Sequence, residues 1–269
     1  MYSDLTLVPE VASIVREASR LMTERTQAGQ IEQKGNDSNY VTATDKAVEN
    51  YLTERLLLLL PGSKVLGEED DNRSTDRECL WIIDPIDGTS NYIRDLGLSV
   101  ISVGLMQKGE LTMGVVYHPY RDEMFSAEKG KGAYVNDRPI HVSDRDFRHS
   151  HLCSAMSLYD KRWAEPCFRV ISRVYEASDD LRRLGTAALE LCYVAAGRVE
   201  LYFEMRLNCW DVAAAFCIIR EAGGIVASIY EPVLPLDHPF LTVAANTEEN
   251  YRRLADIVRE EIPVTPYEH

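Results

Sequence analysis

Two aspartates three residues apart, Asp84 and Asp87, end an apolar run and are followed at once by a Gly-Thr turn. Residues 80–83 predict a short buried strand, and Pro85 is expected to stop that strand at Asp84, because proline cannot continue a central ladder. Carboxylates at the end of a buried strand, beside backbone N–H groups freed by an Asp-Gly turn, can hold hard cations and the anion that those cations bind. The pattern therefore indicates a metal-dependent phosphate-ester hydrolase.

Acidic residues stand in three sequence-distant clusters: residues 68–71, Asp84 with Asp87, and Asp211. Each cluster also has an interpretation without a metal. Residues 68–71 could be a solvated surface loop, and Asp84 with Asp87 a pair of turns. Asp211 could be a helix N-cap, a role that is compatible with metal binding. Two like charges about 4 Å apart repel by roughly 4 kcal/mol at an effective dielectric of 20, and a fold is stabilised by only about 5–15 kcal/mol. Divalent cations reverse the sign of this repulsion, and all-oxygen ligands favour Mg²⁺ over zinc.

Composition limits the partners and the compartment. The net charge of −14 over 269 residues, with no basic stripe, argues against a general nucleic-acid binder. The same charge would repel a phosphorylated substrate unless bound cations reverse the local field. No apolar run reaches about 18 residues and no signal peptide is evident, so we expect no membrane association. Six scattered cysteines without a C-x-x-C pair indicate buried reduced thiols and a cytoplasmic protein.

The predicted elements differ between the two halves of the chain. Helices are predicted near 10–21 and 45–60, separated by a polar loop at Gly29 and 35–39, and strands at 98–107, 111–118 and 123–128 predict an antiparallel meander. After about residue 150, strands at 151–155, 199–204, 225–230 and 240–245 alternate with helices near 163–177, 186–196, 211–222 and 247–261. The pattern indicates α+β followed by α/β, in one unit over 1–269 with lobes at about 1–148 and 149–269.

Five blocks of sequence resemble the inositol monophosphatase family, and they occur in the family's order. The blocks are VTATD at 41–45, GEE at 67–69, DPIDGTSNY at 84–92, GKGAY at 130–134, and WDVAA at 210–214 with EAGG at 221–224. The resemblance covers nearly the whole chain. It implies the layered αβαβα sandwich of the inositol monophosphatase and fructose-1,6-bisphosphatase type, a homodimer, and a Mg²⁺-dependent, lithium-sensitive phosphomonoesterase that acts on myo-inositol monophosphate or a related polyol or sugar phosphate.

The resemblance also implies which residues hold two to three Mg²⁺ ions. The expected ligands are Glu68, Asp84 and the Ile86 carbonyl for a first ion, and Asp84, Asp87 and Asp211 for a second, with Glu68 also touching a third, weaker ion. A water on the first ion would be the nucleophile, because the ion lowers its pKa. The second ion would stabilise the leaving alkoxide, and no cysteine or histidine nucleophile stands out.

Three residues are expected to direct the attacking water. The resemblance implies that Thr89 and Glu68 orient and deprotonate it, while Asp45 accepts a hydrogen bond from Thr89. Independently, Thr89 lies two residues from Asp87 across a glycine, so its hydroxyl can approach the same ion. The alternative for Thr89 is a turn hydroxyl that caps its own backbone.

Substrate contacts are likewise implied by the resemblance. The Gly88 and Thr89 N–H groups would cradle the phosphate, and positions 185–187 with Glu204 match those that bind substrate hydroxyls. Thr186 could equally be the N-cap of the following helix, and Glu204 a surface charge. The complete set of expected contacts is Gly88, Thr89, Ser90, Gly185, Thr186, Ala187, Glu204 and Asp211.

Alternative functions stay open at this point. Within the same superfamily the substrate could be adenosine 3′,5′-bisphosphate, fructose 1,6-bisphosphate, histidinol phosphate or NADP. In bisphosphate nucleotidases the Gly-Thr pair of this motif is followed by residues similar to Lys-Glu-Phe. This chain has Ser-Asn-Tyr at 90–92 instead, which favours the monophosphatase branch. An alternative from another class is a regulatory protein that contacts RNA polymerase, with incidental catalysis.

Overall fold

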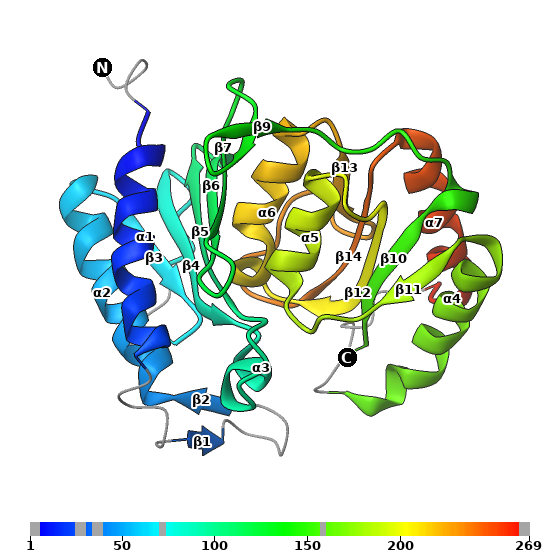
Figure 1. Cartoon of the computed structure of the whole chain (residues 1–269), viewed down its shortest axis with the longest axis horizontal. Coiled ribbons are helices and arrows are strands. Elements are labelled where there is room, and N and C mark those ends of the chain that lie inside the picture. Colours follow the sequence, from blue (N-terminus) through cyan, green and yellow to red (C-terminus); the bar gives the residue numbers. More distant parts are fainter. Residues whose placement is uncertain (1–5, 25–30, 34–39, 70–73, 157–159, 264–269) are drawn as a thin grey trace.

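Two large β-sheets alternate with three layers of helices across the described part of the molecule, and a third sheet consists only of the antiparallel pair β1 (Ile31–Gln33) and β2 (Tyr40–Thr42) (Figure 1). The computed structural model describes residues 6–24, 31–33, 40–69, 74–156 and 160–263. This arrangement is the predicted αβαβα sandwich. The predicted polar loop at Gly29 and 35–39, and the acids Asp70 and Asp71, lie outside the described residues.

The larger sheet, its helices and the separate β1-β2 pair come from the first part of the chain. The elements are α1 (Val8–Thr23), β1 (Ile31–Gln33), β2 (Tyr40–Thr42), α2 (Ala43–Leu59), β3 (Lys64–Gly67), β4 (Cys79–Asp87), α3 (Thr89–Ile93), β5 (Val100–Gln107), β6 (Glu110–His118), β7 (Glu123–Glu128), β8 (Ala133–Val135) and β9 (Arg138–Ile140). The predicted helices and the meander of three strands are confirmed. The short elements β1, β2, β3, α3, β8 and β9 were not predicted.

The second part of the chain alternates strands and helices as predicted. Its elements are the 3₁₀ turn η1 (Phe147–His149), β10 (His151–Ala155), the 3₁₀ turn η2 (Lys161–Trp163), α4 (Ala164–Ala177), β11 (Asp180–Arg182), α5 (Ala187–Ala195), β12 (Leu201–Leu207), α6 (Cys209–Glu221), β13 (Ile225–Ser228), β14 (Phe240–Ala245) and α7 (Glu248–Glu261). All described helices are too short or too polar to cross a membrane.

The larger sheet has the order β3-β4-β5-β6-β7-β8-β9, with β3 parallel to β4 and the other neighbours antiparallel. The prediction that its central strand stops at Asp84 is wrong, because β4 continues to Asp87. Asp84 pairs with Ser102 and Asp87 with Val100, with a shift of register between them. This β-bulge takes Pro85 out of the ladder, so its missing N–H leaves no gap in the sheet.

The smaller sheet has the order β11-β10-β12-β14-β13 and is mixed. Strand β10 runs parallel to β11 and β12, while β14 is antiparallel to β12 and β13. Helices α5 and α6 lie between the two sheets, α1 and α2 cover the outer face of the larger sheet, and α4 and α7 cover the outer face of the smaller one (Figure 1).

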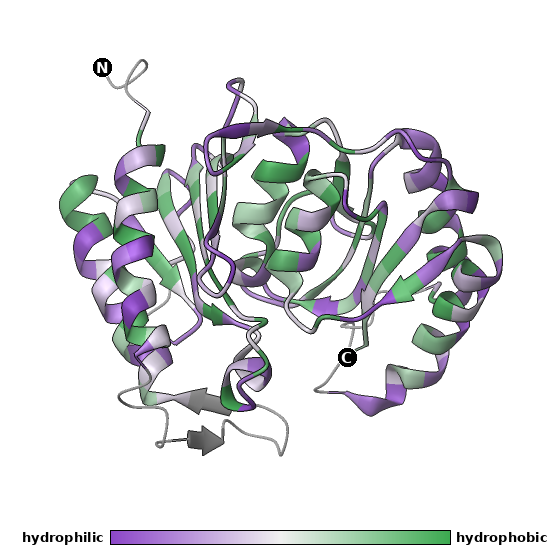
Figure 2. Cartoon of the chain, viewed as in Figure 1, coloured by the Kyte–Doolittle hydropathy of each residue, from purple (hydrophilic) through white to green (hydrophobic). Residues whose placement is uncertain are grey.

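Buried apolar side chains form three clusters that hold these layers together. One lies between α1, α2 and the larger sheet, one surrounds α5 and α6, and one lies between the smaller sheet and helices α4 and α7. Figure 2 shows α6 as mostly hydrophobic, and ten of its side chains, from Cys209 to Ile219, are buried. At Gly114 in β6, an added Cβ would lie 2.1 Å from the Ala214 carbonyl oxygen, so α6 approaches the sheet there more closely than any side chain permits. All six cysteines are free thiols, five of them buried.

Candidate active site

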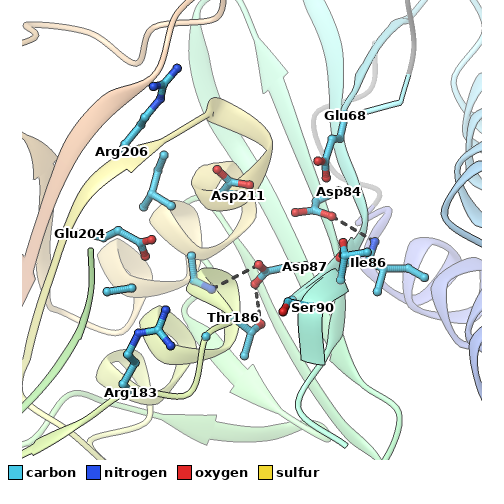
Figure 3. Close-up of a pocket in the computed structure, with 16 residues that line it drawn as sticks. Glu68, Asp84, Ile86, Asp87, Ser90, Arg183, Thr186, Glu204, Arg206 and Asp211 are labelled. Carbon is cyan, nitrogen blue, oxygen red and sulfur yellow. Dashed lines mark hydrogen bonds between the residues drawn. The ribbon is translucent and has the colours of Figure 1, made fainter. Parts of the chain in front are cut away.

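One pocket between the two sheets gathers residues from β4, α3, α5, β12 and α6 (Figure 3). Every site residue expected from the sequence lines it except Asp45. The lining residues are Glu68, Asp84, Ile86, Asp87, Gly88, Thr89, Ser90, Ala155, Arg183, Gly185, Thr186, Ala187, Glu204, Arg206, Leu207 and Asp211. The fold therefore brings members of all three acidic clusters to one place, namely Glu68, the pair Asp84 and Asp87, and Asp211.

The β-bulge of β4 shapes the first part of the pocket. The Asp84 side chain is only 1% exposed, and its Oδ1 accepts a hydrogen bond of 3.0 Å from the Ile86 N–H. The Glu68 N–H donates to the Ile83 carbonyl at 3.2 Å, which places Glu68 alongside the same strand. The carboxylates of Glu68 and Asp84 are neighbours in Figure 3.

Asp87 caps the first turn of α5, although it lies a hundred residues before that helix in sequence. The Thr186 hydroxyl donates to Asp87 Oδ2 at 2.6 Å, the Ala188 N–H donates to the same oxygen at 2.7 Å, and the Ala187 N–H donates to Oδ1 at 3.3 Å. Thr186 does occupy the N-cap position, but its side chain makes no capping bond of its own. These bonds join the end of β4 to the layer of helices between the sheets.

Asp211 lies in the first turn of α6 and is not the N-cap considered from the sequence. The helix begins two residues earlier than predicted, and Asn208 is its N-cap. Asp211 is the third helical residue of a capping box, in which its Oδ2 accepts from the Asn208 N–H at 2.6 Å. A carboxylate in this turn also interacts favourably with the helix dipole.

Burial and mutual repulsion raise the pKa values of the clustered carboxylates. Burial raises the pKa of Asp84 well above its usual value, and Glu68, Asp87 and Asp211 raise it further. Burial likewise raises the pKa of Asp211, with Asp87 as the largest charged neighbour. The pKa of Asp87 rises to about 6 through burial, which outweighs the hydrogen bond from Thr186. These acids are therefore close enough to disfavour one another's charged form.

The donor set fits a hard divalent cation by its chemistry, since it consists of carboxylate oxygens and a backbone carbonyl. Within the described residues, no group of three or more His, Cys, Asp or Glu side chains has the arrangement of a preformed metal site. Asp87 is bonded to the first turn of α5, and Asp211 to the Asn208 N–H at the start of α6.

Thr89 begins α3, and its hydroxyl bonds to nearby backbone. Its Oγ1 lies 3.0 Å from the Ile86 carbonyl oxygen and 3.4 Å from Asp45 Oδ1. Asp45 is fully buried behind the pocket, where it accepts a hydrogen bond of 2.7 Å from the Thr42 N–H in the capping box of α2. Burial raises the pKa of Asp45 to about 6. Both sequence interpretations of Thr89, a turn hydroxyl and a partner of Asp45, describe part of this geometry.

The far part of the pocket carries Glu204, which is therefore not the surface charge considered as its alternative. The Tyr202 hydroxyl donates to Glu204 Oε2. Burial raises the pKa of Glu204 to about 8. Ser90 lies at the other side, and its hydroxyl accepts a bond of 2.7 Å from Arg94.

Several residues that shape the pocket were missed by sequence reasoning. The Asn91 amide donates to the carbonyls of Leu98 at 2.9 Å and Leu184 at 2.8 Å, while buried Glu190 accepts from the Leu184 N–H. Glu49 accepts from the Glu69 N–H at 2.9 Å and so holds the loop that carries Glu68. Spacing offered a signal for two of them, because Glu49 and Glu190 each follow a predicted site residue by four positions and share its helix face.

Substitution of Gly88 is expected to disturb this pocket. Gly88 has φ +86°, and a Cβ there would lie 2.9 Å from the Leu98 carbonyl oxygen and 3.1 Å from Thr186 Cβ. We expect Gly88→Ala to lower the free energy of unfolding by about 2–4 kcal/mol, from left-handed strain plus overpacking. Gly62→Ala is the matched control, since its φ is +88° with no atom within 4 Å of the new Cβ. Equal losses in the two variants, measured by urea unfolding, would contradict this account.

The raised pKa values predict opposite effects of pH on the metal-free and the metal-bound protein. Asp45 and Asp87 have folded-state pKa values of about 6, above the unfolded value near 4. The folded state therefore holds protons that the unfolded state releases, and the stability of metal-free protein should fall as pH rises from about 4 to about 6. Cation binding needs the deprotonated acids, so the rise in Tm caused by Mg²⁺ should be larger at pH 8 than at pH 5. Equal rises at both pH values would refute the prediction.

Comparison with known proteins places this geometry in context. A profile described as "Inositol monophosphatase family" matches residues 4–262. The chain is 39% identical over 191 residues to "Nus factor SuhB" of Pasteurella multocida, which covers 70% of this chain and 72% of that protein. Among solved structures, it is similar to the extragenic suppressor protein SuhB from Bartonella henselae, with 29% identity, a TM-score of 0.84, and coverage of 96% of this chain and 100% of that one. It is also similar to inositol monophosphatase from Anabaena, with 30% identity, a TM-score of 0.80, and coverage of 94% and 95%.

Proposed function

Because the chain belongs to the inositol monophosphatase family, we propose that it is a Mg²⁺-dependent phosphomonoesterase of myo-inositol monophosphate or a related polyol or sugar phosphate. Membership of this family supports phosphatase activity in general. The observation that carries the proposal is that four acids distant in sequence line a single pocket together with a threonine hydroxyl and a turn of backbone: Glu68, Asp84, Asp87, Asp211, Thr89 and Gly88.

The proposed metal ligands are oxygen donors from both sides of the pocket. Two to three Mg²⁺ ions would be held by Glu68, Asp84, the Ile86 carbonyl, Asp87 and Asp211. Bound Mg²⁺ supplies positive charge that attracts the phosphate and lowers the pKa of a water molecule. Burial, followed by repulsion from neighbouring acids, raises the pKa values of Asp84 and Asp211, which supports a site that gains stability from cations.

The proposed catalytic residues direct the attacking water. Glu68 takes a proton from it, and the Thr89 hydroxyl orients it. Buried Asp45, 3.4 Å from Thr89 Oγ1, keeps that hydroxyl in position. The Gly88, Thr89 and Ser90 segment holds the phosphate through its N–H groups, where fixed donors stabilise developing negative charge without reorganisation.

The proposed contacts to the alcohol part of the substrate lie further along the pocket. They are Gly185, Thr186, Ala187, Glu204 and Asp211. Because the pKa of Glu204 is about 8, its carboxyl holds a proton at neutral pH and is able both to donate to and to accept from substrate hydroxyls. Lithium sensitivity, a homodimer, a cytoplasmic location and a single two-lobed unit complete the proposal.

Phosphate release tests the metal requirement directly. Myo-inositol 1-phosphate is incubated with the protein in Mg²⁺ and, separately, in excess chelator. We expect release with Mg²⁺ and none above background with chelator. Equal rates in both would refute the metal-dependent mechanism.

A panel of esters tests the substrate class. Myo-inositol 1-phosphate is compared with fructose 1,6-bisphosphate, adenosine 3′,5′-bisphosphate, histidinol phosphate and NADP at equal Mg²⁺. The sequence Ser-Asn-Tyr at 90–92 favours the monophosphatase branch over the bisphosphate nucleotidases. A higher kcat/KM for the nucleotides than for myo-inositol 1-phosphate would indicate that the protein belongs to another branch of the superfamily.

A regulatory binding function is the second candidate, because relatives carry the name Nus factor SuhB. We propose that this regulatory function is association with RNA polymerase, and that phosphatase activity is incidental to it. Copurification with RNA polymerase that is undiminished in Asp84→Asn would favour this candidate. Absence of copurification under the same conditions would count against it, and binding to nucleic acid itself is still predicted to be absent.

A further inference from the structure

The pocket carries opposite charge at its two ends. Glu68, Asp84, Asp87 and Asp211 lie at one end, and two arginines, Arg183 and Arg206, lie at the other end on either side of Glu204 (Figure 3). These are the pocket's only cationic side chains within the described residues. The roles proposed above leave both arginines without a function.

Arg183 stands immediately before the loop that holds Thr186. Its guanidinium points towards Glu204 in Figure 3, and its charge lowers the pKa of both Glu204 and Glu190, so it lies within electrostatic reach of the alcohol-binding end. Across the described ranges, no acid forms an ion pair with Arg183. The preceding residue, Arg182, is paired with Asp180.

Arg206 lies two residues after Glu204 on β12 and is half-buried. It lines the pocket on the side of Glu204 opposite Arg183, and its guanidinium points away from Glu204 (Figure 3). Its charge also lowers the pKa of Asp160, which forms a pair of 2.7 Å with Arg162. Arg206 therefore has an acidic neighbour outside the pocket. We expect Arg183 to make the larger contribution to the charge at this end of the pocket.

We propose that Arg183 and Arg206 bind a second anionic group of the phosphate-ester substrate. This group is a phosphate or a carboxylate on the alcohol part of the ester. The inference rests on the proposed phosphatase function and narrows its substrate class to esters of anionic sugars or polyols. A guanidinium presents paired donors that match the oxygens of either group. A chain with net charge −14 has no general attraction for such a group, so local cations must supply it.

The test compares kcat/KM for three esters at saturating Mg²⁺. Myo-inositol 1-phosphate has a neutral alcohol part, fructose 1,6-bisphosphate carries a second phosphate, and phosphogluconate carries a carboxylate. We expect Arg183→Gln to lower kcat/KM for the favoured anionic ester by about 10–100-fold, mainly through KM, and for the inositol ester by less than about threefold. Arg206→Gln should have a smaller effect in the same direction, and Arg183→Lys should restore part of the loss.

Arg252→Gln on α7 is the matched control, since Arg252 is exposed and paired with Glu248 at 3.0 Å. Whichever anionic ester responds identifies the second group as phosphate or carboxylate. Mg²⁺-dependent hydrolysis of all three esters with equal losses in the arginine variants, or with none, would overturn the inference while leaving the phosphatase function standing. No hydrolysis of any ester would overturn both.

Discussion

Replacing Asp84 with asparagine is expected to reduce Mg²⁺-dependent phosphate release by on the order of 1,000-fold or more, because the proposed ligand is shared by two ions. Loss of a shared ligand removes several kcal/mol of charge stabilisation, and each 1.4 kcal/mol is a factor of ten in rate. The measurement is kcat/KM on the best ester of the panel. Unimpaired turnover in the variant would contradict the assignment of Asp84.

The same substitution should not destabilise the metal-free protein. Asp84 is 1% exposed, and its pKa is raised by burial first and then by Glu68, Asp87 and Asp211. Asparagine removes that unfavourable charge and keeps the shape, so Tm in chelator at pH 7 should be unchanged or higher. In contrast, the rise in Tm that Mg²⁺ causes in the wild type should shrink, since mass action stabilises only protein that binds the ion.

A distant aspartate separates this effect from a general loss of charge. Asp256 is exposed on α7 and pairs with Arg259 at 3.3 Å. We expect Asp256→Asn to keep wild-type turnover and the wild-type response of Tm to Mg²⁺. Inactivity of Asp84→Asn together with a large fall in its Tm would instead indicate a structural role for Asp84.

Local patterns predicted the elements that are long and strongly periodic. Helix α1 follows the 3.6-residue period, and strands β5, β6 and β7 are apolar runs separated by turn residues, so they could be located to within two residues. Helix α2 starts two residues earlier than predicted because the Thr42 hydroxyl, at the N-cap, accepts hydrogen bonds from the Thr44 and Asp45 N–H groups, a detail that no period reveals. Short elements such as α3 carry too few residues to show a period at all.

The bulge in β4 shows where local reasoning fails. Proline is a sound signal for the end of a central strand, yet here β5 supplies the pairing partner on both sides of the irregularity, at Ser102 and Val100. Tertiary pairing overrode a local rule. The result matters for the site, because the bulge is what brings Asp84, the Ile86 carbonyl and Asp87 onto one pocket wall.

The sequence blocks that resemble the family identified the acids of the site, but not the hydrogen bonds that those acids accept. No sequence pattern shows that Asp87 caps α5 across a hundred residues, since that contact exists only after the two sheets have assembled. Arg183 and Arg206 were missed for a related reason. They lie outside the blocks that resemble the family, and only the folded chain places them on either side of Glu204.

Removal of the Thr89 hydroxyl should have the second largest effect on turnover. Thr89→Ala takes away the group that is proposed to orient the water, and a positioned proton-transfer group contributes about 100–10,000-fold. Because Thr89 Oγ1 also lies 3.0 Å from the Ile86 carbonyl oxygen, its loss frees a proposed ligand as well. We expect kcat to fall by about 100-fold or more with KM little changed, and Thr89→Ser to restore most of the rate.

Asp45→Asn provides the test of whether Thr89 acts through its buried neighbour. The two oxygens lie 3.4 Å apart, so the variants should act on one unit, and the double variant should lose little more than Thr89→Ala alone. Losses that multiply would show that Asp45 acts separately, for instance through the capping box of α2 that it forms with Thr42. Urea unfolding of each variant distinguishes that structural effect, because a lost capping bond lowers stability by about 1 kcal/mol whether or not Mg²⁺ is present.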